Sequence, residues 1–99
     1  ETGDTIMNGM NCGTVSYTAW EILRKGVDAS VEVLDADVHH DVQYLHAQGV
    51  QIGPCGAAPL TALRRLGSVS ATEKLLQLDE NSVVVLFATE GARDYVVPA

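Results

Sequence analysis

The feature that most constrains this chain is an uninterrupted apolar run near its C-terminal end. Residues 82–87 have the sequence SVVVLF, with three consecutive valines followed by leucine and phenylalanine. β-Branched and aromatic residues favour strands, and a strand that is apolar on both faces is typical of a parallel sheet covered by helices on both sides. The run therefore predicts an α/β fold in which residues 82–87 form a buried strand.

The rest of the chain alternates between helical and extended patterns. Residues 27–34 (VDASVEVL) are rich in valine and alternate in part, which predicts a second strand. Thr14 and Ser16 are candidate N-caps of a first helix, and Gly26 occupies the position of a left-handed C-cap. Helices are expected over residues 17–25, from Asp35 or Asp37 to Gly49, over residues 57–66 and over residues 72–78, with a turn at 79–81. The helix positions expected to be buried are Val38, Val42, Leu45, Leu60 and Leu63.

A sheet of this size is not complete by itself. Two or three strands flanked by about four helices make only a fragment of a parallel sheet, and a two-stranded sheet is not stable alone. At least one strand edge then needs a partner from another chain or from a further segment. We therefore expect part of a larger α/β domain that forms a homo-oligomer through exposed strand edges, and leave open any other protein partner.

Charge and hydropathy argue against several functions. Thirteen acidic and six basic residues give a net charge of -7, which repels phosphate backbones and argues against nucleic-acid binding. No apolar run approaches the roughly 20 residues that a membrane-spanning helix needs, so no membrane association is expected. A hydrophobic content of 46% is enough to bury a core, and residues 4–99 are expected to form one partial domain. The two cysteines, Cys12 and Cys55, permit at most one disulfide.

A succession of short motifs runs through nearly the whole chain, from Asp4 to Tyr95. They are, in order, residues 4–13 (DTIMNGMNCG), 20–23 (WEIL), 27–28 (VD), the acidic-capped helix over 35–49, 56–58 (GAA), 83–87 (VVVLF) and 88–91 (ATEG). This succession resembles the serine/threonine dehydratase-like pyridoxal-phosphate enzymes, and within them the diaminopropionate ammonia-lyase branch. Each motif has little specificity alone, and their common order carries the resemblance.

The resemblance implies the C-terminal part of the large domain of a tryptophan-synthase-β-like enzyme of fold type II. In that family a lysine forms a Schiff base with pyridoxal phosphate, and the full-length protein eliminates ammonia from a diamino acid by α,β-elimination. The Schiff-base lysine and the glycine-rich phosphate loop belong to segments upstream of the matched part. Neither Lys25 nor Lys74 matches the lysine motif. The residues that the resemblance places against the cofactor are Asn8, Gly9, Cys55, Gly56 and Thr89.

Two positions depart from the family pattern. A glutamate commonly precedes the glycine-alanine turn, whereas this chain has Gly53-Pro54-Cys55 there. Ala88 stands where a hydroxyl usually bonds the pyridine nitrogen, with Thr89 beside it as a substitute. Because the lysine and the phosphate loop are also missing, we expect the isolated chain to bind no cofactor and to have no catalytic residues of its own.

Three further features could suggest a function and are each weighed against a structural interpretation. Cys55 lies at an expected helix start, where a thiolate is favoured, but the sequence places no histidine base beside it. His39 and His46 are seven residues apart, about 10 Å along a helix, so one metal ion cannot hold both and no metal site is expected. Residues 8–13 either approach the cofactor cleft or form a glycine-rich connection before a helix cap.

Two functional hypotheses of different classes follow. The first is the C-terminal portion of an ammonia-lyase-like protein, not catalytic on its own. The second is a stand-alone, non-catalytic interaction module derived from the same fold, either secreted and effector-like or self-associating. The family resemblance implies a cytoplasmic protein. If Glu1-Thr2-Gly3 is instead a remnant of leader cleavage, the chain is secreted and a Cys12–Cys55 disulfide becomes accessible.

Overall fold

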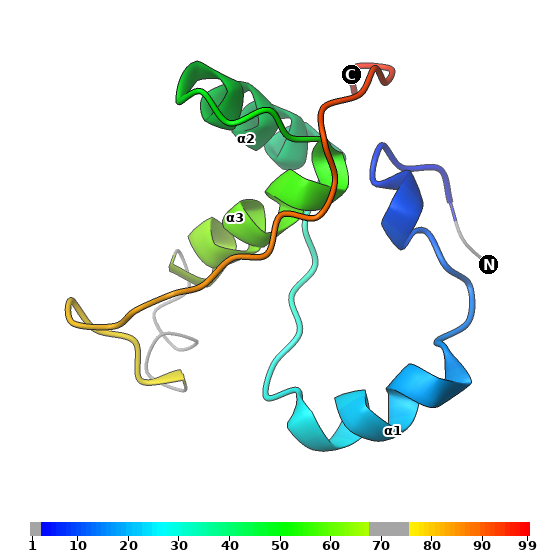
Figure 1. Ribbon diagram of the computed structural model, residues 1–99, viewed down its shortest axis with the longest axis vertical. Helices are drawn as coiled ribbons and strands as arrows, with labels where there is room; N and C mark the ends of the chain where they lie inside the picture. The colour runs from blue at the N-terminus through cyan, green and yellow to red at the C-terminus, as the bar shows by residue number, and fades with distance from the viewer. Residues whose placement is uncertain (1–2, 68–75) are drawn as a thin grey trace.

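The structure, a computed structural model, describes residues 3–67 and 76–99. Within these residues the regular secondary structure is entirely helical: a short 3-10 helix η1 (Asn8–Met10), and the α-helices α1 (Tyr17–Gly26), α2 (Asp35–Ala47) and α3 (Pro54–Gly67). Helices α2 and α3 pack against each other, and η1 packs against α3. Figure 1 shows α1 set apart from this group, while the C-terminal segment meets the start of α3 around Glu90.

The first two helices lie close to where the sequence predicts them. Ser16 is the N-cap of α1, as expected, because its hydroxyl oxygen accepts from the Ala19 N–H. Gly26 is the last residue of α1 and not a left-handed cap; the left-handed backbone occurs at Gly49, after α2, with φ of 85°. Asp35 does not cap α2, because its carboxylate accepts from the Ile6 N–H at 3.0 Å and from the Thr5 hydroxyl.

Helix α3 begins three residues earlier than the sequence indicates. The glycine-proline-cysteine-glycine stretch over residues 53–56, which the sequence predicts to be a tight turn before this helix, instead includes its first turn, which starts at Pro54. Proline suits the first helical position because its missing N–H would have no partner there, and its fixed φ is already helical. The consequence for the site is that Cys55 and Gly56 lie within the first turn of a helix.

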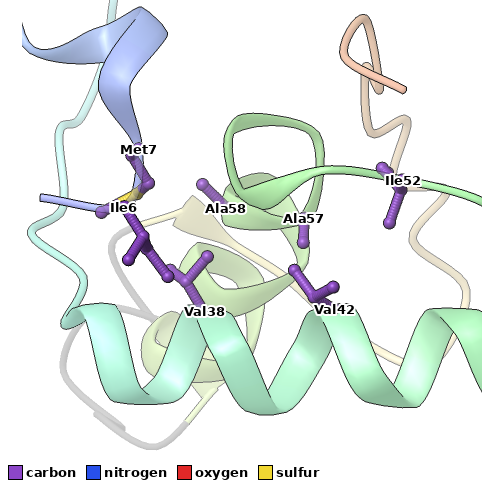
Figure 2. Packing of buried hydrophobic residues seen from close by; sticks show 7 residues of the cluster. All are labelled: Ile6, Met7, Val38, Val42, Ile52, Ala57 and Ala58. Atoms are coloured by element: carbon purple, nitrogen blue, oxygen red, sulfur yellow. The ribbon is translucent and has the colours of Figure 1, made fainter. Parts of the chain in front are cut away.

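The core lies where α2 and α3 cross, beside the N-terminal segment (Figure 2). Val38 and Val42 of α2 face Ala57 and Ala58 of α3. The alanines are small, so the two helices approach closely. Leu60 and Leu63 are only partly buried and are not core residues, in contrast to the prediction. The seven buried hydrophobic residues are Ile6, Met7, Val38, Val42, Ile52, Ala57 and Ala58, and Leu45 packs partly buried against them.

The predicted fold class, an α/β fragment with a parallel sheet, is contradicted by the structure. Residues 27–34 and 82–87 were expected to be strands, but the described ranges contain no strand. Both segments are extended without being paired. A strand requires a neighbour for its backbone N–H and C=O groups. No backbone hydrogen bond joins these two segments. The intrinsic preference of the valines therefore yields an extended chain and not a sheet.

Side-chain exposure along the apolar run shows that it has the geometry of a strand without a partner. Val83, Val85 and Phe87 are 90%, 71% and 78% exposed, whereas Val84 and Leu86 are 45% and 41% exposed. This alternation with period two is what an extended backbone gives when one face lies nearer the rest of the chain. Both faces of the run remain open to solvent to a large extent.

The connections on either side of this run agree only in part with expectation. The turn predicted at residues 79–81 is confirmed: the Ser82 N–H donates to the Asp79 carbonyl at 3.1 Å, and the Asn81 N–H donates to the Asp79 side chain at 2.8 Å. The helix predicted over residues 72–78 lies largely outside the described residues. In the described ranges no helix has the length and apolar character required to cross a membrane.

The chain exposes more surface than a compact protein of its mass. Its accessible surface is 7530 Å², whereas folded monomers of 10.5 kDa expose about 5,400 Å². Its radius of gyration is 14.5 Å, compared with about 13 Å for a compact chain of this length. The excess surface is roughly 2,000 Å².

Candidate functional site

Three segments that are far apart in the sequence meet at the start of α3. The Gly53 N–H donates to the Glu90 carbonyl at 3.2 Å, and the Cys55 N–H donates to the Glu90 carboxylate at 2.7 Å. Gly9 of η1 approaches from the other side, since a β-carbon there would lie 3.3 Å from the Cys55 sulfur. The first turn of α3 is therefore enclosed by η1 and by the segment around Glu90.

Two glycines make this close approach possible. A β-carbon on Gly53 would lie 2.6 Å from the Gly91 carbonyl oxygen and 2.7 Å from the Glu90 carboxylate. A β-carbon on Gly56 would lie 2.5 Å from the Ile52 side chain. Contacts this short are not tolerated, so a β-carbon at Gly53 requires the backbone at Gly91 to shift, and one at Gly56 requires the Ile52 side chain to shift.

The electrostatic centre of the cluster is the Glu90 carboxylate. It lies at the N-terminus of α3, where the helix dipole favours negative charge, and Arg93 Nε donates to its Oε1 at 2.7 Å. Partial burial by itself raises the pKa of the Glu90 carboxyl. The hydrogen bonds from Arg93 and from the Cys55 N–H, with the charge of Arg93, outweigh that effect and hold this pKa below its ordinary value.

Arg93 also connects this cluster to a neighbouring groove. Its guanidinium donates to the Ile6 carbonyl, and it lines a groove of about 690 Å³ together with Asn8 and Tyr95. The Tyr95 hydroxyl lies 2.7 Å from His39 Nδ1, and burial raises the pKa of that hydroxyl against the opposing charge of Arg93. The groove lies between the N-terminal segment, residues 4–8, and the end of the chain, residues 93–99.

The residues predicted to contact a cofactor lie in or next to this cluster, but not all of them point to one place. Gly9, Cys55 and Gly56 lie together at the start of α3. Asn8 is exposed in η1 and lines the neighbouring groove. Thr89 is exposed and precedes Glu90, which makes the contacts instead.

Sequence reasoning missed three residues that organise the cluster: Gly53, Glu90 and Arg93. A signal for two of them was present, because Glu90 and Arg93 have opposite charges, are three residues apart, and lie shortly after the apolar run. The spacing of Gly53 and Gly56 around a proline was a signal for close backbone approach. What no local pattern indicates is that the Glu90 carboxylate reaches across 35 residues to the Cys55 N–H.

The described residues only partly fit pyridoxal phosphate. They form a wall of glycines and backbone N–H groups, but the Cys55 N–H, which could hold an anion, is already taken by Glu90. Lys25 lies on α1, which packs against none of the other described helices, and Lys74 lies outside the described residues. Among the described residues, no lysine lies at this cluster.

Other chemistry suggested by the residue types finds no support in the geometry. Cys12 and Cys55 are both free thiols, and within residues 3–67 and 76–99 no histidine lies within hydrogen-bond distance of Cys55. His39 contacts Tyr95, while His46 Nε2 lies 2.9 Å from the Ile52 carbonyl. Among the described residues no group of three or more potential ligands is arranged to hold a metal ion.

No protein-family model, no curated protein and no solved structure matches this chain. The candidate site therefore depends on the geometry at the start of α3 and on the order of the motifs.

Proposed function

We propose that the chain supplies one wall of a pyridoxal-phosphate site in an ammonia-lyase-like protein, and that it does not carry out the elimination by itself. The wall consists of Asn8, Gly9, Cys55, Gly56 and Thr89. The diamino-acid substrate, the lysine that holds the cofactor and the cytoplasmic location belong to the same proposal. No parallel sheet is part of it.

The observation that supports this function best is the meeting of three motif-bearing segments at the start of α3. More than thirty residues of sequence separate Gly9 from Cys55, and Cys55 from Glu90. In the structure, Gly9 and Glu90 both lie beside Cys55. A cofactor bound there would supply the electron sink for the elimination. The chain's own part is to present glycine surfaces and to hold the Glu90 carboxylate at the helix N-terminus.

The test begins with the reading frame upstream of Glu1. We expect it to encode a lysine motif of the S-x-K-x-R-G type and a glycine-rich loop. The protein translated from that frame should release ammonia from 2,3-diaminopropionate when pyridoxal phosphate is present. Gly53→Ala should lower this activity at least about tenfold, because its β-carbon displaces Glu90 and the first turn of α3. Gly26→Ala is the control, since nothing lies within 4 Å of that position.

The 99-residue chain provides a second arm of this test. Incubated with pyridoxal phosphate and then borohydride, it should show no stoichiometric mass increase on Lys25 or Lys74. A single lysine modified to completion would contradict the claim that the attaching lysine comes from elsewhere. An upstream frame that encodes only a secretion leader would contradict the lyase proposal as a whole.

A second candidate function, a non-catalytic interaction module that forms homo-oligomers, is favoured by the exposed apolar run. Residues 83–88 make no backbone hydrogen bonds within the described chain, and the exposed surface exceeds that of a compact chain by roughly 2,000 Å². A standard interface needs only about 800 Å² from each partner. Pairing of this run with a second copy would satisfy its backbone groups and cover its valines.

Sedimentation velocity of the 99-residue chain over a range of concentrations tests this second candidate. We expect a dimer that Val85→Lys abolishes, because Val85 is an exposed residue at the centre of the run. Val96→Lys is the matched control, since Val96 is also largely exposed, at 86% against 71% for Val85, but lies outside the run. A monomer at all concentrations, or equal loss of the dimer in both variants, would contradict pairing through this segment.

A further inference from the structure

A buried carboxylate between α2 and α3 lacks half of its hydrogen bonds. Asp41 of α2 is only 2% exposed, and its Oδ2 accepts from the Thr61 hydroxyl of α3 at 2.7 Å. Its Oδ1 is also buried but accepts no hydrogen bond. Buried carboxylate oxygens are normally paired with donors, because an unsatisfied one is costly. His40 Nδ1 lies 3.7 Å from this oxygen, beyond hydrogen-bond distance, so the oxygen can still accept from a closer donor.

The nearest cation covers this oxygen without bonding to it. Arg64 Nε lies 3.3 Å from Asp41 Oδ1, too poorly aligned for a hydrogen bond, and the guanidinium lies 4.7 Å from the centre of the Tyr44 ring. The Arg64 side chain is 44% exposed, so it can swing outward with little loss of packing. An incoming donor could then reach Asp41 while Arg64 stays at the rim.

A cavity of about 280 Å³ opens at this point, between the two helices. It exceeds the roughly 150 Å³ cavity that is known to hold benzene in a protein core, so a small organic molecule fits. Its α2 wall carries the carboxylates of Asp37 and Asp41, and its α3 wall carries Arg64 and Arg65. The two walls therefore have opposite charges that are balanced overall.

We propose that this cavity binds a small zwitterionic α-amino acid. The ligand's ammonium donates to Asp41 Oδ1, and its carboxylate accepts from Arg64 at the rim. A cation alone would take Asp41 away from Arg64 and leave that guanidinium without its counter-charge, and an anion alone would face the buried Asp41. A metal ion is less suited, since the described residues provide no group of three or more ligands here. This site is separate from the start of α3 and does not depend on the lyase proposal.

The test is a titration of the full 99-residue chain, labelled with nitrogen-15, with L-alanine. We expect saturable shifts of the amides of Asp41 and Thr61, with a dissociation constant in the millimolar range because the ligand is small. Ethylamine has only the ammonium and propionate only the carboxylate, so each should bind about tenfold more weakly or worse. Absence of saturable shifts with L-alanine, or equally tight binding of either half-ligand, would overturn the proposal.

Variants assign the two charges. Asp41→Asn keeps the shape of the side chain and should weaken L-alanine binding at least about tenfold, as should Arg64→Gln. Arg24→Gln on α1 is the charge-matched control and should bind normally. If Asp41→Asn does not fold, the exposed Arg64 decides the outcome. Undiminished binding by a folded Asp41→Asn variant, or by Arg64→Gln, would overturn the assignment.

Discussion

Helices α1 and α2 are similar in length but differ completely in how they are packed. Helix α2 buries Val38, Asp41 and Val42 against α3, whereas α1 buries no residue and packs against no other described helix. Yet α1 has its apolar residues gathered more strictly on one face than α2 does. The stronger amphipathic pattern therefore belongs to the helix without a partner. An amphipathic pattern indicates that one face of a helix packs against an apolar surface, but it does not identify that surface.

The same division runs through the rest of the chain. The packed region consists of residues 6–9, α2, α3 and residues 90–95, held together by the core and by the Glu90 contacts. The open region consists of α1, the extended segment after it and the apolar run over 82–87. Substitutions in the packed region should therefore alter the stability of the isolated chain, and those in the open region should alter only its association.

The largest effect is expected for Gly53→Ala. Its β-carbon would meet the Gly91 carbonyl oxygen and the Glu90 carboxylate, so the free energy of unfolding should fall by about 3 kcal/mol. Urea unfolding followed by circular dichroism at 222 nm measures it, since Trp20 lies in the open region and reports poorly on the core. Gly26→Ala should instead stabilise the chain slightly, because it replaces a helical glycine with open space around it. Equal effects of both substitutions would contradict the division.

A smaller loss is expected for Val38→Ala. Val38 is fully buried at the crossing of α2 and α3, so its truncation should lower the free energy of unfolding by about 2 kcal/mol. Val27 is half-exposed at the start of the extended segment that follows α1. The same substitution there should lower the free energy of unfolding by less than about 0.5 kcal/mol. Urea midpoints of the two variants give the comparison directly. A Val27→Ala variant as unstable as Val38→Ala would show that the open region is packed in solution.

Glu90→Gln should cost about 1–2 kcal/mol near neutral pH, because it removes charged hydrogen bonds to Arg93 and Cys55. Since the pKa of Glu90 is lower in the folded chain, its stabilising contribution is present above the unfolded-state pKa, about 4.3, and is lost as pH falls through the folded pKa. The two proteins should therefore converge in stability as pH falls to that range. Glu21→Gln, in an exposed pair on α1, should show no such convergence. A parallel pH dependence for Glu90→Gln and the parent chain would contradict the role of Glu90.

The smallest effect is expected for Ile22→Ala in α1. Ile22 is largely exposed, so in the dilute chain the free energy of unfolding should change by less than about 0.5 kcal/mol. Chemical denaturation at low protein concentration checks this. A loss near 2 kcal/mol would mean that α1 is covered within a single chain.

Much of the helical structure was predictable from local signals, while the absence of a sheet among the described residues was not. Ser16 marks the start of α1, and the spacing of Val38 and Val42 marks the buried face of α2. The valines of residues 82–87 specify an extended backbone, and that is what the chain has; pairing depends on a second strand that local sequence does not supply. Likewise Cys55 and Gly56 were identified from their motif, but the Glu90 carboxylate that meets them comes from a distant segment, and no periodicity encodes such a contact.

Amide hydrogen exchange of the 99-residue chain tests the division between the two regions most directly. At low concentration, the backbone amides of α2 around Val42 and of α3 around Thr61 should be protected, because these helices enclose the core. The amides of residues 83–88 should exchange freely, and should become protected only as the concentration is raised and copies associate. Protection of residues 27–34 and 83–88 in the dilute monomer would contradict this division, because it would show that the two segments are paired within one chain.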